Sequence, residues 1–503
     1  MTYDCIIIGS GVGGITAACL LVKKGYSVLL LEKNSQVGGN ASCFYQDGLR
    51  FEYAVHQVSG MMNIYHIGYI LKEIGVFERI NAIKIEDFIS IVYPEKRFYI
   101  RDNLDSLLEN LNRVKPHREN ERYVNFLKDV VTFIHHYGWL DSKFGIEAPD
   151  FPFRMIFTGI PSIYKFLQSF NKASKEFFDK YFPEIADNDI AYFLSPYFGV
   201  SPKTQSALVN IGGTASYLSS GSYYPQGGTE NFISIFIEKF KDFGGSYKTN
   251  NEVKKIIKKD RLFEVVTIGK DSYQTKSVIY AASPVDLFSK VLKLDNPSQE
   301  VKNYITNLYK LEPSISVVRI FCTVDGTVED FNEVGYETFI YNTDNLESYF
   351  DAVSKGDISG MSLLLPFKID KDNRTYEKLP VIITMLFPYI LNSEFEKIKN
   401  SIIDRSFSII NRFYPQFSSL RLIKILSPED LYRRTFTVNG AMYGWSCTPQ
   451  QAFFNRLSNC TPVDGVFLCG HFTRPMHGIS GVIRSGYITS RIVDKYLSRL
   501  FKK

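Results

Sequence analysis

The sequence has few residues suited to crosslinking the chain or binding a metal. Its seven cysteines are dispersed and never occur in C-x-x-C spacing, which predicts free thiols in a reducing compartment. Its seven histidines show no ligand spacing, and the adjacent pair His135 and His136 does not share a helix face. No motif pairs a cysteine or serine with a histidine, so nucleophilic catalysis has little support. We expect no disulfide framework and no metal.

The sequence also lacks a long apolar run and a one-sided charge. No run approaches the about 18 residues needed to span a bilayer, and the first apolar strand begins almost at the start, so we expect no signal peptide. The net charge of +5 comes from scattered Lys and Arg, which predicts no nucleic-acid partner. It modestly favours an anionic membrane surface or an acidic carrier protein. We expect a cytoplasmic protein that can associate peripherally with a membrane.

No repeats, low-complexity stretches or linkers interrupt the chain. At 503 residues, two or three domains are expected. Aromatic residues make up 15% of the chain, with 40 Phe and 32 Tyr. This excess indicates an aromatic-rich core or a long apolar tunnel, and the two interpretations are compatible.

The N-terminal segment contains a complete dinucleotide-binding fingerprint. Residues 5–8 predict a buried strand, and a G-x-G-x-x-G turn follows at Gly9, Gly11 and Gly14. Gly9 allows the tight turn, Gly11 lets the backbone approach a pyrophosphate, and Gly14 lets the next helix, residues 15–24, pack on the strand. The helix N-terminus offers N–H groups and a positive dipole end to the phosphates. The segment therefore predicts a Rossmann-type unit.

The residues after this helix indicate which dinucleotide is bound. A second strand, residues 27–31, ends at Glu32, whose distance from Gly9 suits the acid that binds ribose hydroxyls. The pair Gly38 and Gly39 resembles the flavoprotein pattern, in which the chain turns back along FAD. We expect cofactor contacts from Gly9, Ser10, Gly11, Gly13, Gly14, Glu32, Lys33, Gly38, Gly39, Asn40 and Ala41.

A second glycine-rich turn lies near the C-terminus. Residues 466–469 predict an apolar strand that ends at Gly470 and His471, and a turn with Gly478 and Gly481 then opens a helix. This turn supplies a second positive dipole end. Such an end suits the N1 and O2 atoms of a flavin, where charge gathers on reduction.

With these two ends, the chain resembles the phytoene desaturase and carotenoid isomerase family of FAD-dependent oxidoreductases, which includes the retinol saturases. The resemblance covers nearly the whole chain and extends to residues 221–229, 243–253, 280–284, 439–445 and 451–456. It implies FAD as the cofactor, with further contacts from Val253, Ala281, Gly470, His471, Gly478, Ile479, Gly481 and Val482.

The resemblance also implies the fold. We expect an α/β protein with a Rossmann-type FAD-binding domain of the glutathione reductase type, a mixed-sheet substrate domain and a helical, aromatic-rich cap. The FAD-binding domain is expected to be discontinuous, formed by residues 1–60, 225–284 and 441–503.

The remaining residues are assigned to the other two parts. Residues 61–224 carry apolar positions at helical spacing, which predicts a helical region. Its aromatic residues either pack a simple core or form a cap that faces substrate or membrane. We expect its aromatic helices, between about 100 and 220, to touch the membrane surface. Residues 285–440 are expected to form the mixed α+β substrate domain, with strands near 315–322, 361–365 and 381–387.

Three positions depart from the family pattern. Glu52 replaces Asp and Ala54 replaces Gly in the F-D-x-G-x-H segment of saturase-like and isomerase-like members. His471 stands where many members carry an acid beside the ribityl chain. A neutral imidazole can accept a hydrogen bond from a ribityl hydroxyl, and a protonated one cannot. We therefore expect FAD affinity to weaken as pH falls through about 6.5.

The chemistry is expected to come from the flavin, because the protein supplies position and electrostatics. No second G-x-G-x-x-G fingerprint is present for bound NAD, so electrons are expected to move to or from a diffusing partner, or to cycle without net transfer. His56 closes the family-like segment and is the first candidate for a catalytic acid or base, with a structural hydrogen bond as the alternative. Tyr443 is a further catalytic candidate beside the flavin.

Three functions remain open. The first is an oxidoreductase of the carotenoid desaturase type, which moves a hydride to or from flavin N5 on CH–CH bonds of a polyene, isoprenoid or carrier-linked acyl chain. The second is a cis–trans isomerase without net redox change, or an amine-oxidase-like flavoenzyme, although no acidic cluster for an amine is evident. The third is a non-enzymatic flavoprotein that binds lipid or a partner protein, against which the intact motifs at both ends argue.

Overall fold

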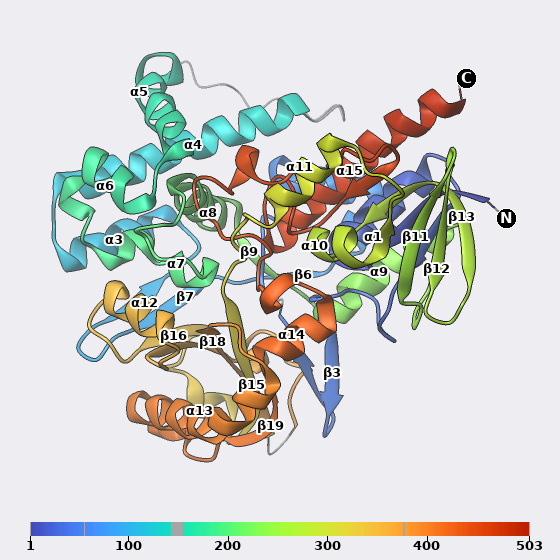
Figure 1. Ribbon diagram of the computed structural model, residues 1–503. Helices are drawn as coiled ribbons and strands as arrows, with labels where there is room; N and C mark the ends of the chain where they lie inside the picture. Colours follow the sequence, from blue (N-terminus) through green and yellow to red (C-terminus); the bar gives the residue numbers. More distant parts are fainter. Residues whose placement is uncertain (1, 55, 142–153, 376–377, 502–503) are drawn as a thin grey trace.

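The computed structural model describes residues 2–54, 56–141, 154–375 and 378–501, and it has two large sheets and a group of helices (Figure 1). The first sheet has eight strands in the order β10-β2-β1-β13-β12-β11-β14, with β20 beside β13. These are β1 (Thr2–Ile8), β2 (Val28–Leu31), β10 (Ser246–Lys248), β11 (Val253–Lys259), β12 (Leu262–Thr267), β13 (Ser272–Tyr280), β14 (Leu292–Lys293) and β20 (Val466–Leu468). The strands β10, β2, β1, β13 and β20 run parallel, as the Rossmann-type prediction requires.

Two glycines bring the first helix to backbone distance from its neighbours. A Cβ at Gly14 of α1 (Val12–Lys23) would lie 2.3 Å from the carbonyl oxygen of Gly9. A Cβ at Gly13 would lie 3.0 Å from the carbonyl oxygen of Val482 in α15 (Gly478–Phe501). The first glycine turn and the last helix of the chain therefore pack directly together.

The second sheet has seven strands in the order β19-β15-β18-β17-β16-β7-β8. These are β7 (Ile89–Val92), β8 (Arg97–Ile100), β15 (Ser316–Asp325), β16 (Glu337–Tyr341), β17 (Gly360–Leu364), β18 (Lys378–Phe387) and β19 (Arg421–Leu426). Alternation along β15 packs Val318 and Ile320 with α13 (Asn392–Phe413), and leaves Val317 and Arg319 on the opposite face. The strands predicted near 315–322, 361–365 and 381–387 are confirmed.

The helical prediction for residues 61–224 is wrong at β6 (Ala82–Lys84), β7, β8 and the start of β9 (Ser222–Pro225). The strand β7 pairs in parallel with β16 of the second sheet and antiparallel with β8. The four residues of β7, Ile-Ser-Ile-Val, are all buried. A short apolar run rich in β-branched residues suits a strand covered on both faces, and its periodicity alone does not distinguish it from a helix.

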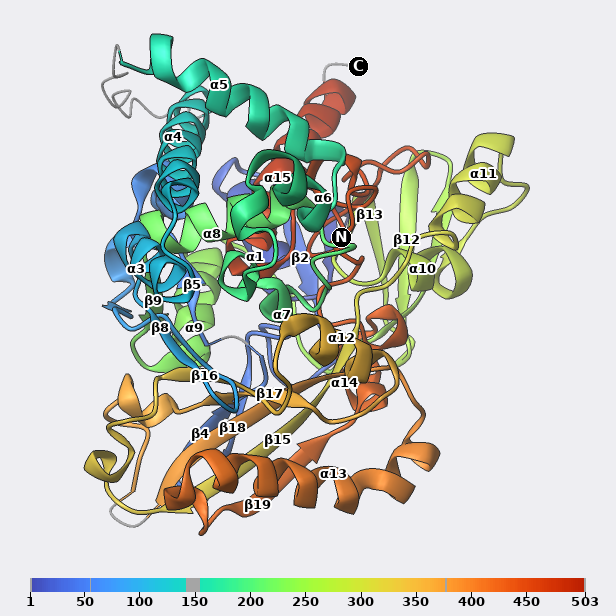
Figure 2. The same ribbon diagram turned by 90° about the vertical axis from the view of Figure 1, so that its left-hand side faces the viewer.

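Most other helices of this region lie above the second sheet in both views (Figure 2). They are α3 (Leu104–Val114), α4 (Arg118–Asp141), α5 (Arg154–Gln168), α6 (Ser174–Tyr181), α7 (Ser195–Phe198) and α8 (Ala207–Ser220). The remaining helix, α2 (Tyr69–Ile74), packs against α1 and α15. The core of α3 to α8 includes the fully buried rings of Tyr123, Phe177, Phe178 and Phe182. The α/β class with a mixed sheet and an aromatic-rich helical part is therefore confirmed. Residues 142–153 of the expected cap, and the side chains of His135 and His136, lie outside the described part.

Shorter elements complete the chain. They are β3 (Cys43–Gln46), β4 (Leu49–Glu52), β5 (Val58–Ser59), β6 (Ala82–Lys84), β9 (Ser222–Pro225), α9 (Gly228–Asp242), α10 (Pro284–Asp286), α11 (Gln299–Leu308), α12 (Leu346–Ser354) and α14 (Pro428–Thr435). Among the described helices, none is both long and apolar enough to cross a bilayer.

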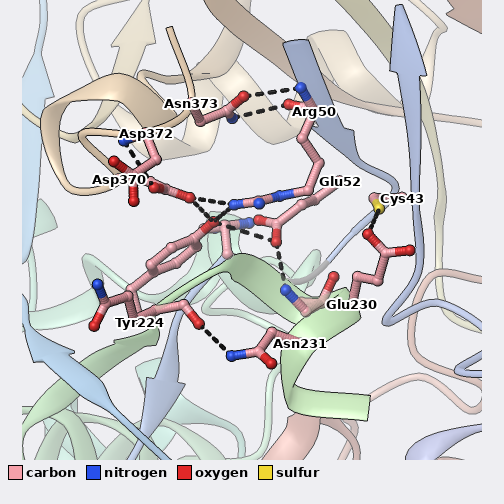
Figure 3. A network of polar contacts seen from close by, with 12 residues as sticks. Cys43, Arg50, Glu52, Tyr224, Glu230, Asn231, Asp370, Asp372 and Asn373 are labelled. Carbon is pink, nitrogen blue, oxygen red and sulfur yellow. Dashed lines mark hydrogen bonds and ion pairs between the residues drawn. The ribbon is translucent and has the colours of Figure 1, made fainter. Parts of the chain in front are cut away.

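A buried ionic network ties β4 to a loop that follows β17 (Figure 3). Arg50 forms an ion pair with Asp370, and its guanidinium donates a 2.9 Å hydrogen bond to the hydroxyl of Tyr224. The Arg50 backbone N–H donates to Asn373 Oδ1 at 2.8 Å, and Asn373 Nδ2 donates back to the Arg50 carbonyl at 2.9 Å. Because the Arg50 and Asp370 side chains are only 11% and 3% exposed, solvent screens their attraction weakly.

The same network explains the acid at position 52. Glu52 Oε1 accepts a 2.7 Å hydrogen bond from the backbone N–H of Thr229, in the first turn of α9. Burial raises the pKa of Glu52 despite this bond and the nearby Arg50. Glu52 thus satisfies an orphan N–H at a helix start, a structural role for one of the positions that depart from the family pattern.

We predict that Asp370→Asn will markedly destabilise the protein. The substitution leaves the buried Arg50 charge without its partner, which costs about 3–5 kcal/mol. The matched control is Asp87→Asn, because Asp87 pairs with Arg101 where the two side chains are 82% and 70% exposed, and such pairs contribute about 0–1 kcal/mol. Urea denaturation of both variants checks this, and equal midpoints would contradict it.

Candidate functional site

A cavity of about 1220 Å³ is lined by every residue that the sequence predicts for the site. These residues are Gly9, Ser10, Gly11, Gly13, Gly14, Glu32, Lys33, Gly38, Gly39, Asn40, Ala41, His56, Val253, Ala281, Tyr443, Gly470, His471, Gly478, Ile479, Gly481 and Val482. They come from both ends and the middle of the chain, so the fold brings together segments that the sequence keeps apart. Their individual roles stay predictions.

One end of the cavity has the geometry of a dinucleotide cradle. Gly11 precedes α1, and no atom lies within 4 Å of the position that a Cβ would take there. Gly39 adopts a φ of +60°, and its own Cβ position is 3.2 Å from the Gly11 Cα. The double-glycine loop therefore passes directly over the first turn, leaving the α1 N-terminus open to an anion.

Glu32 is held firmly at this end. Its Oε2 accepts from the backbone N–H and the hydroxyl of Ser10 at 3.0 and 2.6 Å, and its Oε1 accepts from the backbone and side chain of Asn34, both at 2.8 Å. A carboxylate has about four acceptor sites, so a ribose hydroxyl would replace one of these donors. The Ser10 hydroxyl can rotate away, which makes it the donor most easily replaced.

Arg434 is a cation at this end that sequence reasoning missed. Its guanidinium donates to the Gly39 carbonyl at 3.3 Å and lies over the Tyr53 ring, 3.4 Å from its centroid. Its buried Nε has no hydrogen-bond partner among the described residues, and the side chain lines the cavity. A buried N–H without a partner is rare, and it fits the site of a phosphate-bearing ligand.

The start of α15 forms a second open turn. Gly470 and Gly478 have φ values of +101° and +72°, and nothing lies within 4 Å of either Cβ position. Both positions line the cavity that Gly11 lines. Two helix N-termini with free space in front of them suit the two halves of a dinucleotide, so the residues present fit such a cofactor.

His471 lies beside this second turn as a neutral ring. Burial, with a contribution from the Arg456 charge, lowers the pKa of His471 to about 3. Neither ring nitrogen makes a hydrogen bond to a described residue, so the ring is available to a ligand in the cavity. The expected loss of FAD affinity near pH 6.5 is therefore wrong for this environment, because the imidazole stays unprotonated throughout that range.

His56 joins a polar cluster on the opposite wall. Its Nε2 lies 3.0 Å from Glu337 Oε2, and its Nδ1 lies 2.9 Å from the Ala54 carbonyl oxygen. The Gln57 side-chain amide donates to the same Glu337 oxygen at 2.6 Å, and the Ser362 hydroxyl donates to Oε1 at 3.1 Å. The Glu337 side chain is 1% exposed and that of His56 is 15% exposed, so the cluster is a largely buried hydrogen-bond network.

The geometry of His56 determines its charge. Both ring nitrogens face oxygen atoms that only accept hydrogen bonds, so both must carry a proton, and the ring is an imidazolium. Burial lowers the pKa of His56, but the charge and hydrogen bond of Glu337 outweigh it, and the pKa is raised overall. His56 and Glu337 thus form an ion pair that holds a proton at the cavity wall.

The rings of Tyr443 and His477 are in contact near α15, with their planes tilted by 30°. Their ring centroids are 4.1 Å apart, and His477 Nδ1 lies 3.3 Å from the Cys447 thiol. Burial raises the pKa of Cys447 to about 11 and lowers that of His477 well below its usual value. Cys447 is therefore a neutral thiol beside the neutral imidazole of His477, and it supplies no thiolate nucleophile.

The rest of the lining is mainly apolar. It includes Phe166, Leu167, Phe170, Tyr197, Phe198, Leu208, Val209, Phe339, Tyr349, Leu386, Met442, Phe453 and Phe454. Many of these rings also belong to the largest hydrophobic cluster. The aromatic excess in the composition thus contributes both to a core and to a cavity wall.

The chain is similar to several known proteins. Residues 7–70 match the NAD(P)-binding Rossmann-like domain family. The chain is 24% identical to a carotenoid 3,4-desaturase of Haloarcula japonica, with 97% of each chain covered. It is 22% identical to an all-trans-retinol 13,14-reductase of Rattus norvegicus, covering 98% of this chain and 86% of the relative. It is also 22% identical to a chloroplastic prolycopene isomerase of Daucus carota, covering 98% and 80%.

The chain is related to this group of carotenoid and retinoid enzymes. The family resemblance stated from the sequence is thereby confirmed. Solved structures share the fold: an oxidoreductase of Methanosarcina mazei has a TM-score of 0.64 at 15% identity, covering 97% of this chain and all of the other. A putrescine oxidase has a TM-score of 0.62 at 14% identity, covering 98% and 99%.

Several cavity residues escaped sequence reasoning. Glu337, Ser362 and Arg319 come from strands of the second sheet, and each is a polar residue at an inward-facing position of an apolar strand. That break in the apolar pattern is the signal that could have indicated them. His477 precedes the second open turn, and its position beside Gly478 was a comparable signal.

Proposed function

We propose that the protein is an FAD-dependent oxidoreductase that acts on carbon–carbon bonds of a long, apolar, unsaturated chain such as a polyene or isoprenoid. The observation that carries this proposal is the cavity itself, which joins two open glycine turns to a long apolar lining. Relatives named as a carotenoid desaturase and a retinol reductase support the same class of chemistry.

Several features support FAD as the dinucleotide. The double-glycine loop over α1 and the second open turn at α15 provide contacts for a cofactor much longer than one nucleotide. Gly11, Gly39 and Arg434 would hold the pyrophosphate, Glu32 the ribose, and His471 and Gly478 the ribityl and ring end. When bound, the flavin supplies the hydride chemistry.

The chain's own residues would orient the substrate and manage a proton. The aromatic and aliphatic lining excludes water and binds the apolar chain along its length. The imidazolium of His56 holds a proton at Nε2 against Glu337, so it can serve as the proton donor in a saturation or take part in the reverse step. Tyr443, whose pKa burial raises, stays a neutral phenol in the wall.

A cis–trans isomerase remains the second candidate, since a prolycopene isomerase is among the relatives. An amine substrate has less support, because the cavity carboxylate of Glu337 already accepts from His56, Gln57 and Ser362. A non-enzymatic role in binding lipid or a partner has less support, although an inactive all-trans-retinol 13,14-reductase of Danio rerio is among the relatives.

Anaerobic incubation of the flavin-loaded protein with carotenes and retinoids tests the proposal. A substrate of the oxidised enzyme should bleach the visible flavin absorbance and yield a product two hydrogens lighter, and a substrate of the reduced enzyme should yield one two hydrogens heavier. A product of unchanged mass would favour the isomerase. Absence of bound flavin from the purified protein would refute both.

We further propose that the cavity fills from a membrane surface. Near its aromatic end lie Leu167 and Phe454, 54% and 67% exposed, and Phe454 stacks on Phe170 with centroids 5.6 Å apart. Exposed large apolar side chains beside a cavity are typical of a lipid-contacting surface. The acidic carrier protein stays an alternative source of substrate.

Liposome flotation measures this contact. We expect the protein to float with vesicles, more with anionic than with neutral lipid, and the double variant Leu167→Ser/Phe454→Ser to lose most of that binding. Removal of each exposed apolar side chain should weaken insertion of the protein into the membrane surface by about 1.5–3 kcal/mol. Leu391→Ser is the control, because Leu391 is 49% exposed and does not line the cavity. Equal flotation of both variants would contradict the proposal.

A further inference from the structure

A row of polar side chains crosses the inner face of the second sheet. Arg319 on β15 lies opposite Thr384 on β18, and Thr384 lies opposite Ser362 on β17. All three line the cavity. The next residue in the row, Phe339 on β16, returns the wall to apolar character. The cavity therefore has a localised polar region in a largely apolar wall.

Arg319 is the charged member of this row, and other residues of the protein accept only part of its hydrogen bonds. The residue is 6% exposed, and one guanidinium nitrogen donates to the Tyr53 carbonyl oxygen. Its buried Nε has no hydrogen-bond partner, and its guanidinium forms no ion pair with any described residue. Burial lowers the pKa of Arg319 to about 10, so the side chain remains a cation at neutral pH.

The neighbouring charges do not neutralise Arg319. Glu337 is the nearby carboxylate in the wall, and it accepts from the imidazolium of His56, from Gln57 and from Ser362. The His56 and Glu337 charges cancel each other, which leaves the Arg319 charge in excess. A buried cation without a counterion is costly, and a ligand anion in the cavity would remove that cost.

We propose that Arg319 binds a carboxylate at one end of the chain-like ligand, so that the substrate class is a long unsaturated acid rather than a pure hydrocarbon or an alcohol. This inference rests on the proposed function, which assigns the apolar lining to the chain. A guanidinium presents parallel N–H donors that match a carboxylate, which neither a hydroxyl nor a hydrocarbon end can use fully.

Equilibrium dialysis of the flavin-loaded protein against all-trans-retinoic acid and all-trans-retinol tests the inference, because these probes share one polyene and differ at one end. We expect the acid to bind the wild type about 10-fold or more tightly than the alcohol, as for a charge-assisted contact. Arg319→Gln should bind both within about 2-fold. Arg319→Lys should keep part of the preference, because it keeps the charge and loses the planar fork.

The control is Arg101→Gln, which removes the same charge from a side chain that is 70% exposed and should retain the full preference. Equal binding of acid and alcohol by the wild type, binding of neither, or an unchanged preference in Arg319→Gln would each overturn the inference. Flavin content is measured on the same samples. A preference for the acid in protein that carries no flavin would refute the proposed function and leave this inference standing.

If Arg319→Gln instead loses flavin while its preference for the acid persists, the guanidinium serves the cofactor, and the inference is overturned. Arg319→Lys keeps the experiment informative if the glutamine variant does not fold, since it preserves a buried cation at the same place.

Discussion

Gly11→Val should yield a folded protein that no longer binds its dinucleotide. The Gly11 Cβ position has no protein atom within 4 Å, so the chain itself tolerates a side chain there. The same space is where the backbone is expected to approach the pyrophosphate. A branched side chain overpacks that fitted contact, which costs about 3 kcal/mol or more, a weakening of roughly 100-fold or more. Flavin absorbance per purified protein, with circular dichroism for the fold, measures the result.

Two further glycine variants give this experiment its controls. Gly269→Ala should retain flavin and fold, because Gly269 has no neighbour closer than 3.8 Å to its Cβ position and does not line the cavity. Gly14→Val should fail to fold, because its Cβ would lie 2.3 Å from the Gly9 carbonyl oxygen. Full flavin content in Gly11→Val would show that the N-terminal turn does not hold the cofactor.

His56→Ala should keep the dinucleotide and lose turnover. If His56 donates or accepts the proton in the reaction, its loss should lower the rate by about 100-fold or more. Flavin content should remain close to that of the wild type, since the ring belongs to the cluster on the second-sheet wall with Glu337. Single-turnover flavin reduction and flavin content, measured together, separate the two effects. His117→Ala, at an exposed position, is the surface control.

Glu337→Gln tests the protonation of His56 directly. The Glu337 charge is what raises the pKa of His56 against burial, so the protonated form persists above the usual histidine range. If that form is the catalytic acid, activity should fall as pH rises through this raised pKa. In Glu337→Gln the attraction between the Glu337 carboxylate and the protonated His56 ring is lost. The pH at which activity falls should therefore move lower. A pH profile identical to that of the wild type would show that His56 is purely structural.

His471→Ala should behave in the opposite way to His56→Ala. If the neutral ring accepts a hydrogen bond from the bound cofactor, its removal costs about 1–3 kcal/mol, and flavin affinity should fall by about one to two orders of magnitude. Because its pKa is about 3, the wild-type affinity should show no step near pH 6.5. A step at that pH would mean that the bound cofactor restores a normal pKa to the ring.

Local sequence was enough to indicate the two glycine turns and the class of the fold. In each turn the strand, the glycines and the following helix are consecutive in the chain, so short-range sterics determine the conformation. The same holds for β15, β17 and β18, whose apolar runs predicted strands. A four-residue apolar segment such as β7 was not assignable locally, because only its pairing with β16 makes it a strand.

Tertiary structure decided the chemistry of the cavity wall. His56 was visible as a candidate, but its charge depends on Glu337, which is 281 residues away in the chain. The open guanidinium of Arg319 and the low pKa of His471 likewise follow from burial among distant segments. Sequence alone therefore determined that this chain has a dinucleotide-binding fold and which turns form it. The protonation states of the cavity side chains, and the donors among them that lack a hydrogen-bond partner, depend on desolvation and on residues brought together by folding. Only the tertiary structure could therefore decide them.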